Sequence, residues 1–230
     1  MNGFSKRAED LRELMDDPRA DEELLFATYR HFRRINRFIS GWGRVYERWI
    51  RPNLQADRAS TLLDVGCGGG DIAADLHRRA ARDGFTLEVT AIDTDERALR
   101  YVRAQSGIEG VSFEQASTTD LLREGRRFDF VTANHVLHHL PGPGIRELAG
   151  QAEQLATRMV IFNDIERSPV AHALFGLYGS IFLRGSFAAV DGRRSIRRGF
   201  TPAELADLMP PGWMVHRQAP YRLLAIHRVP

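Results

Sequence analysis

The sequence predicts an α/β fold built on one mostly parallel sheet of about seven strands, closed by an antiparallel hairpin. Three observations support this prediction. In residues 62–71, LLDVGCGGGD, an apolar strand runs into a glycine-rich turn and a helix start. The apolar run 87–92 reads as the next buried strand and ends in Asp93, 23 positions after Gly70. Two strand-like stretches near the C-terminus, 213–218 and 221–229, predict the hairpin.

The glycine-rich turn predicts a ligand site. Side chains at Gly66 or Gly68 would block both the sharp turn and the close approach of a ligand. The helix expected from about Ile72 offers free N–H groups and the positive end of its dipole. In a strand-helix-strand unit, an acidic residue at the end of the second strand accepts the hydroxyls of a ribose. Asp93 is therefore predicted to bind an adenosine-like ribose, with capping of the next helix as the alternative.

Two classes of ligand use such a turn. Dinucleotide enzymes carry G-x-G-x-x-G, but the sixth position here is Asp71, whose carboxylate would repel a pyrophosphate. The pattern instead resembles the D-x-G-x-G-x-G motif of class I S-adenosylmethionine-dependent methyltransferases, with Asp64, Gly66, Gly68 and Gly70 at the motif positions. This resemblance implies a Rossmann-like fold and S-adenosylmethionine as cofactor, with S-adenosylhomocysteine as product.

A second motif strengthens the resemblance. The run FDFVTANHVLHHL, residues 128–140, resembles the fourth-strand motif of the same family, so the likeness covers about residues 58–165. It implies further cofactor contacts at Cys67, Thr94, Ala116, Ser117 and Asn134. Thr94 would lie beside the adenine and Asn134 at the methionine end. Methyltransferases of this class often bind the adenine amino group through an aspartate after the third strand; here Ser117 stands there, with Asp120 three residues later.

The resemblance also indicates catalytic candidates. His138 stands where the histidine base of some phenol O-methyltransferases occurs, and a structural histidine is the alternative. Asp164 follows the fifth strand and is a second candidate base or orienting group, unless it only caps a helix. Tyr29 and Asn36, on an N-terminal helix, are the residues there that we expect to line the substrate pocket.

We expect no metal at this site. His135, His138 and His139 lie within five residues, a pattern that would suit a metal ion. However, the family needs none, and no cluster of Cys, Asp or Glu with ligand spacing accompanies them.

Composition sets outer limits on the function. The chain has 230 residues, enough for one α/β domain with a helical extension. A net charge of +2 gives no strong nucleic-acid signal. Cys67 is the single cysteine, which excludes disulfides and thiolate-rich metal sites, and we expect it to be a small residue under the cofactor rather than a reactive thiol. Without an apolar signal core or an apolar run of about 18 residues, we expect a cytoplasmic protein with no membrane span.

Residues 1–55 are expected to form an N-terminal helical cap. Amphipathic spacing predicts helices over 7–15 and 21–38, and after a break at 40–43 a third over 45–50 that Pro52 ends. In small-molecule methyltransferases such extensions cover the cofactor and wall the substrate pocket, and the resemblance implies the same here.

The remaining residues, 56–230, are expected to form the Rossmann-like domain. Helices are predicted over 72–83, after Asp95 and over 145–157, and strands over 111–115, 128–133 and 159–162. An insert follows the fifth strand at about 165–200. Its segment 170–183 is apolar nearly all round, which favours a lid or the wall of an apolar pocket, with an ordinary buried helix as the alternative. Thr201, Pro202 and Glu204 predict a capped helix start.

Four arginines close the insert: Arg193, Arg194, Arg197 and Arg198. They could bind phosphate or RNA. Because Phe200 is the only aromatic residue beside them, a surface cluster or internal pairing with carboxylates is favoured.

These features together predict methyl transfer from S-adenosylmethionine to oxygen, or to carbon, of an apolar phenolic, quinol or polyketide-like small molecule. The core is similar to ubiquinone and menaquinone methyltransferases, and the apolar insert to enzymes of secondary metabolism. Two alternatives stay open: an RNA or protein methyltransferase that uses Arg193–Arg198, and a cofactor-binding protein without catalytic activity.

Overall fold

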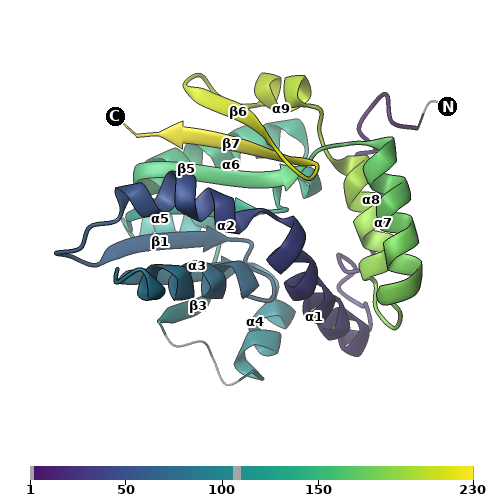
Figure 1. The fold of residues 1–230 in the computed structure, drawn as a ribbon, viewed down its shortest axis with the longest axis horizontal. Coiled ribbons are helices and arrows are strands. Elements are labelled where there is room, and N and C mark those ends of the chain that lie inside the picture. The colour runs from purple at the N-terminus through teal and green to yellow at the C-terminus, as the bar shows by residue number, and fades with distance from the viewer. Residues whose placement is uncertain (1–2, 106–109, 230) are drawn as a thin grey trace.

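The computed structural model describes residues 3–105 and 110–229 and is shown in Figure 1. Within these residues seven strands form one sheet in the order β3-β2-β1-β4-β5-β7-β6. The strands are β1 (Ser60–Val65), β2 (Leu87–Asp93), β3 (Val111–Gln115), β4 (Phe128–Asn134), β5 (Ala156–Ile165), β6 (Trp213–Gln218) and β7 (Arg222–Arg228). Strands β1 to β5 run parallel, whereas β7 pairs antiparallel with both β5 and β6. The predicted mostly parallel sheet with a C-terminal hairpin is confirmed.

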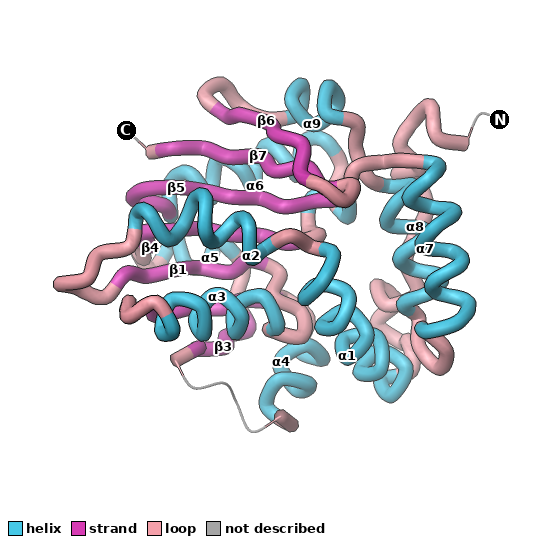
Figure 2. The backbone as a smooth tube through the Cα atoms, viewed as in Figure 1, coloured by secondary structure: helices cyan, strands magenta, loops and turns pink. Residues whose placement is uncertain are grey.

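Helices cover both faces of the sheet, as the ribbon in Figure 1 and the tube in Figure 2 show. They are α1 (Glu22–Ile39), α2 (Trp42–Val45), α3 (Asp71–Arg82), α4 (Glu96–Arg103), α5 (Thr118–Arg123), α6 (Gly142–Leu155), α7 (Pro169–Phe182), α8 (Ala188–Arg198) and α9 (Pro202–Leu208). Leu148 and Leu205 pack against one face of the sheet with Val131. Leu76 and Tyr46 pack against the other face with Phe130. Burial of both faces explains why the parallel strands are continuous apolar runs.

The expected N-terminal helix over residues 7–15 is wrong. Residues 3–20 contain no helix, and residues between Ala8 and Met15 form hydrogen bonds with α8 instead. The N–H groups of Leu14 and Met15 donate to the buried carboxylate of Asp191, at 2.7 and 3.0 Å. A short isolated helix is only marginally stable. The hydrogen bonds to Asp191 therefore stabilise the non-helical path of this segment over a helix.

The rest of the N-terminal cap is close to the prediction. Helix α1 begins where Asp21 accepts a hydrogen bond from the N–H of Leu24. The third helix begins at Trp42, earlier than expected, and continues as a π-helical turn over Tyr46–Ile50. None of the helices among the described residues combines the length and the apolar character that crossing a membrane requires.

The insert after β5 forms two packed helices, α7 and α8. In Figure 1 they stand with α1 beyond the end of the sheet to which β5 points. The parallel strands therefore direct their carboxyl ends at a space bounded by α1, α7 and α8. Open α/β sheets bind ligands at this edge.

Candidate functional site

A cavity of about 760 Å³ opens at the carboxyl ends of the parallel strands. Such a volume is typical of small-molecule and cofactor sites. Predicted cofactor residues that line it are Asp64, Gly66, Cys67, Gly68, Asp93, Thr94 and Asn134. Tyr29, Asn36 and His138 also line it, together with residues of α7. The structure thus brings both predicted ends of the site, for cofactor and for substrate, into one cavity.

The glycine-rich turn is shaped by close contacts. Gly66 has a φ of +66°, and a Cβ there would lie 2.6 Å from a methyl group of Val136. Gly70 has a φ of +71°, and its Cβ would collide with the ring of Phe113 at 2.6 Å. Both positions therefore require glycine. Gly70 does not line the cavity, so its direct role is packing at the start of α3.

Asp93 holds the glycine turn against β2. One carboxylate oxygen accepts the N–H of Gly68 at 2.8 Å, and the other accepts the N–H of Asp95 at 2.9 Å. Asp95 rather than Asp93 is the N-cap of α4. Each oxygen of a carboxylate keeps a second lone pair, so Asp93 can still accept the hydroxyls of a ribose. Burial raises the pKa of Asp93, while the backbone N–H groups oppose that rise.

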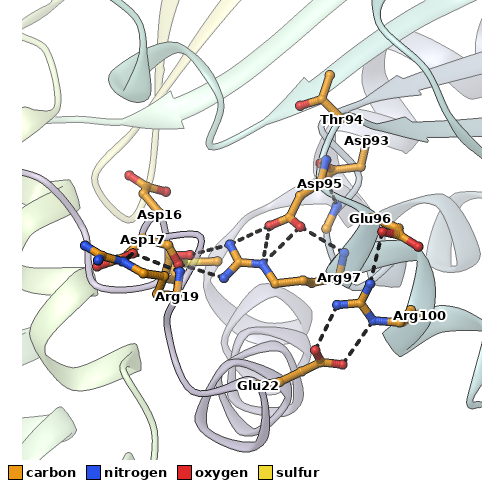
Figure 3. Close-up of polar contacts among 12 residues, drawn as sticks. Asp16, Asp17, Arg19, Glu22, Asp93, Thr94, Asp95, Glu96, Arg97 and Arg100 are labelled. Atoms are coloured by element: carbon orange, nitrogen blue, oxygen red, sulfur yellow. Dashed lines mark hydrogen bonds and ion pairs between the residues drawn. The ribbon is translucent and has the colours of Figure 1, made fainter.

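Figure 3 shows how the N-terminal segment is fastened to α4 near Asp93 and Thr94. The guanidinium of Arg97 pairs with Asp95 at 2.7 Å and donates to the carbonyl groups of Met15 and Asp17. Glu22 of α1 pairs with Arg100 of α4 at 2.8 Å. Residues far apart in the sequence are thus held together around Asp93 and Thr94.

Two further carboxylates give this end of the cavity acidic character. Burial raises the pKa of Asp64 to about 7, although a hydrogen bond from Thr132 opposes the rise. Burial likewise raises the pKa of Asp71 to about 6 against a hydrogen bond from Asn36. Desolvated carboxylates gain from a cationic ligand, so this end suits an ammonium or sulfonium group.

The N-terminal cap is bonded directly to the sheet edge. The indole N–H of Trp42 donates to the side-chain oxygen of Asn134 at 2.9 Å, and the amide of Asn163 donates to the carbonyl of Ser40 at 2.8 Å. Tyr29 packs against the glycine turn: a Cβ at Gly69 would lie 3.2 Å from that of Tyr29. Burial and the charge of Asp93 raise the pKa of Tyr29, so its phenol stays protonated. This placement suits covering the cofactor better than proton transfer.

His138 and Asp164, predicted as separate candidates, form one buried pair. Nδ1 of His138 lies 2.7 Å from Oδ1 of Asp164, and the backbone N–H of His138 donates to Oδ2 at 3.2 Å. Asp164 is not a helix cap, because Ser168 caps α7.

Burial alone would lower the pKa of His138, but the charge and hydrogen bond of Asp164 outweigh it and raise that pKa to about 9. Burial would raise the pKa of Asp164, but His138 holds it well below its ordinary value. Asp164 thus orients the imidazole and is too weak a base to take a proton itself.

Glu13 is a site residue that sequence reasoning missed. It is buried, its Oε1 lies 3.4 Å from Nε2 of His138, and it accepts a hydrogen bond from Ser195 at 2.7 Å. Glu13, His138 and His139 each offer one possible metal-ligand atom, and these three atoms lie within 4.8 Å of one another. No signal in its charge-rich segment predicts this position, because Glu13 and His138 are 125 residues apart.

His135 and Arg222 also line the cavity and were not predicted as site residues. His135 has a φ of +60°, and its Nε2 is buried without a hydrogen-bond partner among the described residues. Burial holds the pKa of His135 well below its ordinary value, so the imidazole is neutral. Arg222 is the first residue of β7. The only signal for it in the sequence is an arginine within a predicted strand.

Two predicted cofactor contacts, Ala116 and Ser117, do not line the cavity. Ala116 donates its backbone N–H to the carbonyl of Asp93 at 3.2 Å. Ser117 is the N-cap of α5 and forms a capping box with Asp120, its hydroxyl donating to that carboxylate at 2.6 Å.

Cys67 is buried, and its pKa is raised well above the ordinary value by burial, as expected for an unreactive thiol.

Two arginines of the α8 run, Arg194 and Arg198, donate hydrogen bonds to backbone carbonyl groups of the protein itself. Arg198 is buried and donates to the carbonyls of His138 and Leu11. Arg194 donates to the carbonyl of Arg12 at 2.7 Å. These bonds fasten the N-terminal segment to α8 and engage two of the four arginines, whereas Arg193 is exposed.

The core of the chain is similar in sequence to known methyltransferases. Residues 62–158 match the family model of the methyltransferase domain. The chain is 32% identical over 161 residues to a ubiquinone biosynthesis O-methyltransferase of Azotobacter vinelandii, covering 68% of this chain and 65% of that protein. It is 27% identical over 162 residues to the enzyme of the same name from Acinetobacter baumannii, covering 69% of this chain and 65% of that protein. The chain thus spans a little less than two thirds of these relatives.

Solved structures share the fold. An O-methyltransferase family protein from Burkholderia thailandensis superposes with a TM-score of 0.59 at 19% identity, covering 94% of this chain and 61% of that one. The plantazolicin methyltransferase BpumL, in complex with a substrate analogue and S-adenosylhomocysteine, superposes with a TM-score of 0.59 at 14% identity, covering 94% and 88%. The Rossmann-like fold expected from the sequence is confirmed.

Proposed function

We propose that the protein methylates a small apolar acceptor, because residues 62–158 match the model of the methyltransferase domain and the chain has the fold of solved methyltransferases. The methyl group would come from S-adenosylmethionine, leaving S-adenosylhomocysteine. An oxygen of a phenolic, quinol or polyketide-like compound is the favoured acceptor, with carbon as the alternative. The names of the relatives, O-methyltransferases of ubiquinone biosynthesis, support oxygen and a quinol-like ring.

The cofactor would occupy the acidic end of the cavity. Asp93 would accept the ribose hydroxyls, Thr94 would lie beside the adenine, and Asn134 would face the methionine portion. Asp64 and Asp71 are the desolvated carboxylates nearest in sequence to the glycine turn, and they would attract the ammonium group. When bound, the cofactor supplies an activated methyl group on a positively charged sulfur.

The acceptor would occupy the end lined by α7 and His138. Leu174, Phe175 and Tyr178 of α7 line this cavity and would pack against an apolar ring and exclude water. As the new carbon–oxygen bond forms, the electrons of the carbon–sulfur bond return to sulfur, and the hydroxyl proton must leave. The imidazole of His138, held by Asp164, is the group we assign to receive that proton at Nε2.

One observation carries this proposal: the glycine turn, Asp93 and His138 line the same cavity. The test begins with calorimetric titration of S-adenosylhomocysteine into the purified protein. It continues with transfer of a labelled methyl group to a panel of phenols and quinols. Absence of cofactor binding would contradict the proposal at its base. Binding without transfer to any acceptor would favour a cofactor-binding protein without catalysis, and label transferred to RNA would favour the nucleic-acid alternative.

A further inference from the structure

Arg222 is a buried cation in the cavity wall. It is the first residue of β7, where it pairs with Ile165 of β5 and Gln218 of β6. The residue is 7% exposed and lines the cavity beside Tyr221 and His135. A guanidinium carries five donors in a planar fork and accepts no hydrogen bond. A charge in this position therefore needs acceptors from its surroundings.

The described residues do not supply those acceptors. No carboxylate among them forms an ion pair with Arg222, and its Nε is buried without a hydrogen-bond partner. Among the described residues, the side chain of Arg222 donates one hydrogen bond, to the carbonyl of Tyr221 at 3.3 Å. The charge of Asp164 acts on Arg222, but this carboxylate is engaged by His138 and by the N–H of Ile165.

Other buried arginines of this chain are well paired. The side chain of Arg167 is 1% exposed and pairs with Glu204 at 2.6 Å, and it also donates to the carbonyl of Gly199. Arg198 donates to two carbonyl groups. An unpaired buried charge is strongly unfavourable. Burial lowers the pKa of Arg222 to about 10, yet the group remains a cation at neutral pH. Arg222 is thus the exception and faces the ligand cavity.

The cofactor is a poor match for this charge. The glycine turn follows β1, and β7 lies three strands away in the order β1-β4-β5-β7. Adjacent strands are about 4.8 Å apart, which gives a lateral separation of about 14 Å. Asn134, at the predicted methionine end, belongs to β4, two strands from β7. Arg222 therefore belongs to the acceptor side of the cavity.

We infer that Arg222 is an anion-binding residue that recognises a carboxylate on an otherwise apolar, ring-bearing acceptor. The planar fork matches the two oxygens of a carboxylate. The buried Nε2 of the neutral His135 offers a second polar contact from β4. The apolar side chains of α7 would hold the ring of the same molecule. This inference rests on the proposed function, because it assumes that the acceptor binds in this cavity.

Benzoate and benzamide provide the test, because they share a ring and differ in charge. Each is titrated by calorimetry into the full-length protein saturated with S-adenosylhomocysteine. Benzoate should bind at least tenfold more tightly than benzamide. Arg222→Met should bring benzoate down to the affinity of benzamide, leave the affinity for S-adenosylhomocysteine unchanged, and raise the melting temperature of the ligand-free protein. Arg228→Met, at the exposed other end of β7, is the matched control and should leave benzoate binding unchanged.

Several results would overturn the inference. The inference would be refuted if the wild-type protein bound benzoate and benzamide equally, or bound neither. This comparison requires no variant. Loss of S-adenosylhomocysteine binding in Arg222→Met would assign the guanidinium to the cofactor carboxylate instead. Should Arg222→Met not fold, Arg222→Gln replaces it with the same expected outcomes for binding. Because these measurements report binding, a failure to find methyl transfer would count against the proposed function and leave the anion site standing.

Discussion

The imidazole Nδ1 of His138 lies 2.7 Å from Oδ1 of Asp164, and both side chains are at most 1% exposed. The pair joins the turn after β4 to the end of β5, at the edge of the sheet where the cavity opens. Glu13 approaches the other nitrogen of the ring. Two carboxylates around one imidazole favour its cationic form, which governs how the site responds to pH.

The rate of methyl transfer should rise with pH up to about 9. His138 can take a proton only when neutral, and its pKa is raised to about 9. Below that value the neutral fraction, and therefore kcat, should increase about tenfold per pH unit. His138→Ala should lower kcat by about 100- to 10,000-fold and flatten the profile. The check is kcat at saturating cofactor between pH 6.5 and 9.5, and a flat wild-type profile would remove His138 as the base.

Asp164→Asn should destabilise the fold. Removing one charge from a buried pair leaves the other uncompensated, at a cost of about 3–5 kcal/mol. Because the pKa of His138 is raised, the contribution of its charged form to the free energy of unfolding is complete below pH 6.5 and is lost as the pH rises through about 9. Because the pKa of Asp164 is lowered, the contribution of its carboxylate to the free energy of unfolding is present above pH 3.8 and is lost in acid.

The difference between wild type and Asp164→Asn should therefore be largest between about pH 4 and 6.5 and shrink toward pH 10. Urea unfolding at several pH values measures it. The partly exposed pair of Asp75 and Arg79, at 31% and 26%, gives the control, since Asp75→Asn should cost less than about 1 kcal/mol. Equal costs for the two substitutions would contradict the buried-pair interpretation.

Asp93→Ala should weaken binding of S-adenosylhomocysteine by at least several-fold. The substitution removes the predicted ribose acceptor and also the hydrogen bond that fixes the N–H of Gly68. Calorimetric titration gives the affinity, and circular dichroism checks that the fold is intact. Glu88→Ala, on the exposed face of the same strand, should bind like wild type. An unchanged affinity in Asp93→Ala would withdraw the ribose assignment.

Affinity for S-adenosylhomocysteine should fall as the pH drops from 8 to 5.5. Burial raises the pKa of Asp64 to about 7 and that of Asp71 to about 6. Protonation below these values removes the negative charges that would attract the ammonium group. Titrations near pH 6.5 in buffers of different ionisation enthalpy should also detect protons released on binding. Constant affinity across this range would place the ammonium group elsewhere.

Treatment with EDTA should leave methyl transfer unchanged, as expected if no metal takes part. Glu13, His138 and His139 could offer ligand atoms, but His138 is a cation at neutral pH and would repel a metal ion. The activity of EDTA-dialysed protein, with and without added Zn²⁺ or Mg²⁺, measures this. Loss on dialysis and recovery with one of these ions would show that a metal is required.

The sequence by itself determined the fold class, and it predicted most of the residues that line the cavity at the ends of β1, β2 and β4. The apolar runs, the glycine turn and Asp93 belong to one continuous strand-helix-strand unit, in which local spacing decides geometry. The same holds for the capped start of α9, where Thr201 and Glu204 form the expected capping box. The predicted helix over 7–15 failed because α8, nearly 180 residues later, supplies hydrogen-bond partners for its backbone.

Only the tertiary structure decided which residues surround His138. Glu13, His135 and Arg222 meet His138 in one cavity because the strand order places β4, β5 and β7 side by side and α8 holds the N-terminal segment above them. Whether a carboxylate orients, caps or accepts a proton depends on its burial and on its neighbours in space. Those neighbours come from distant parts of the chain, so spacing along the sequence could not reveal them.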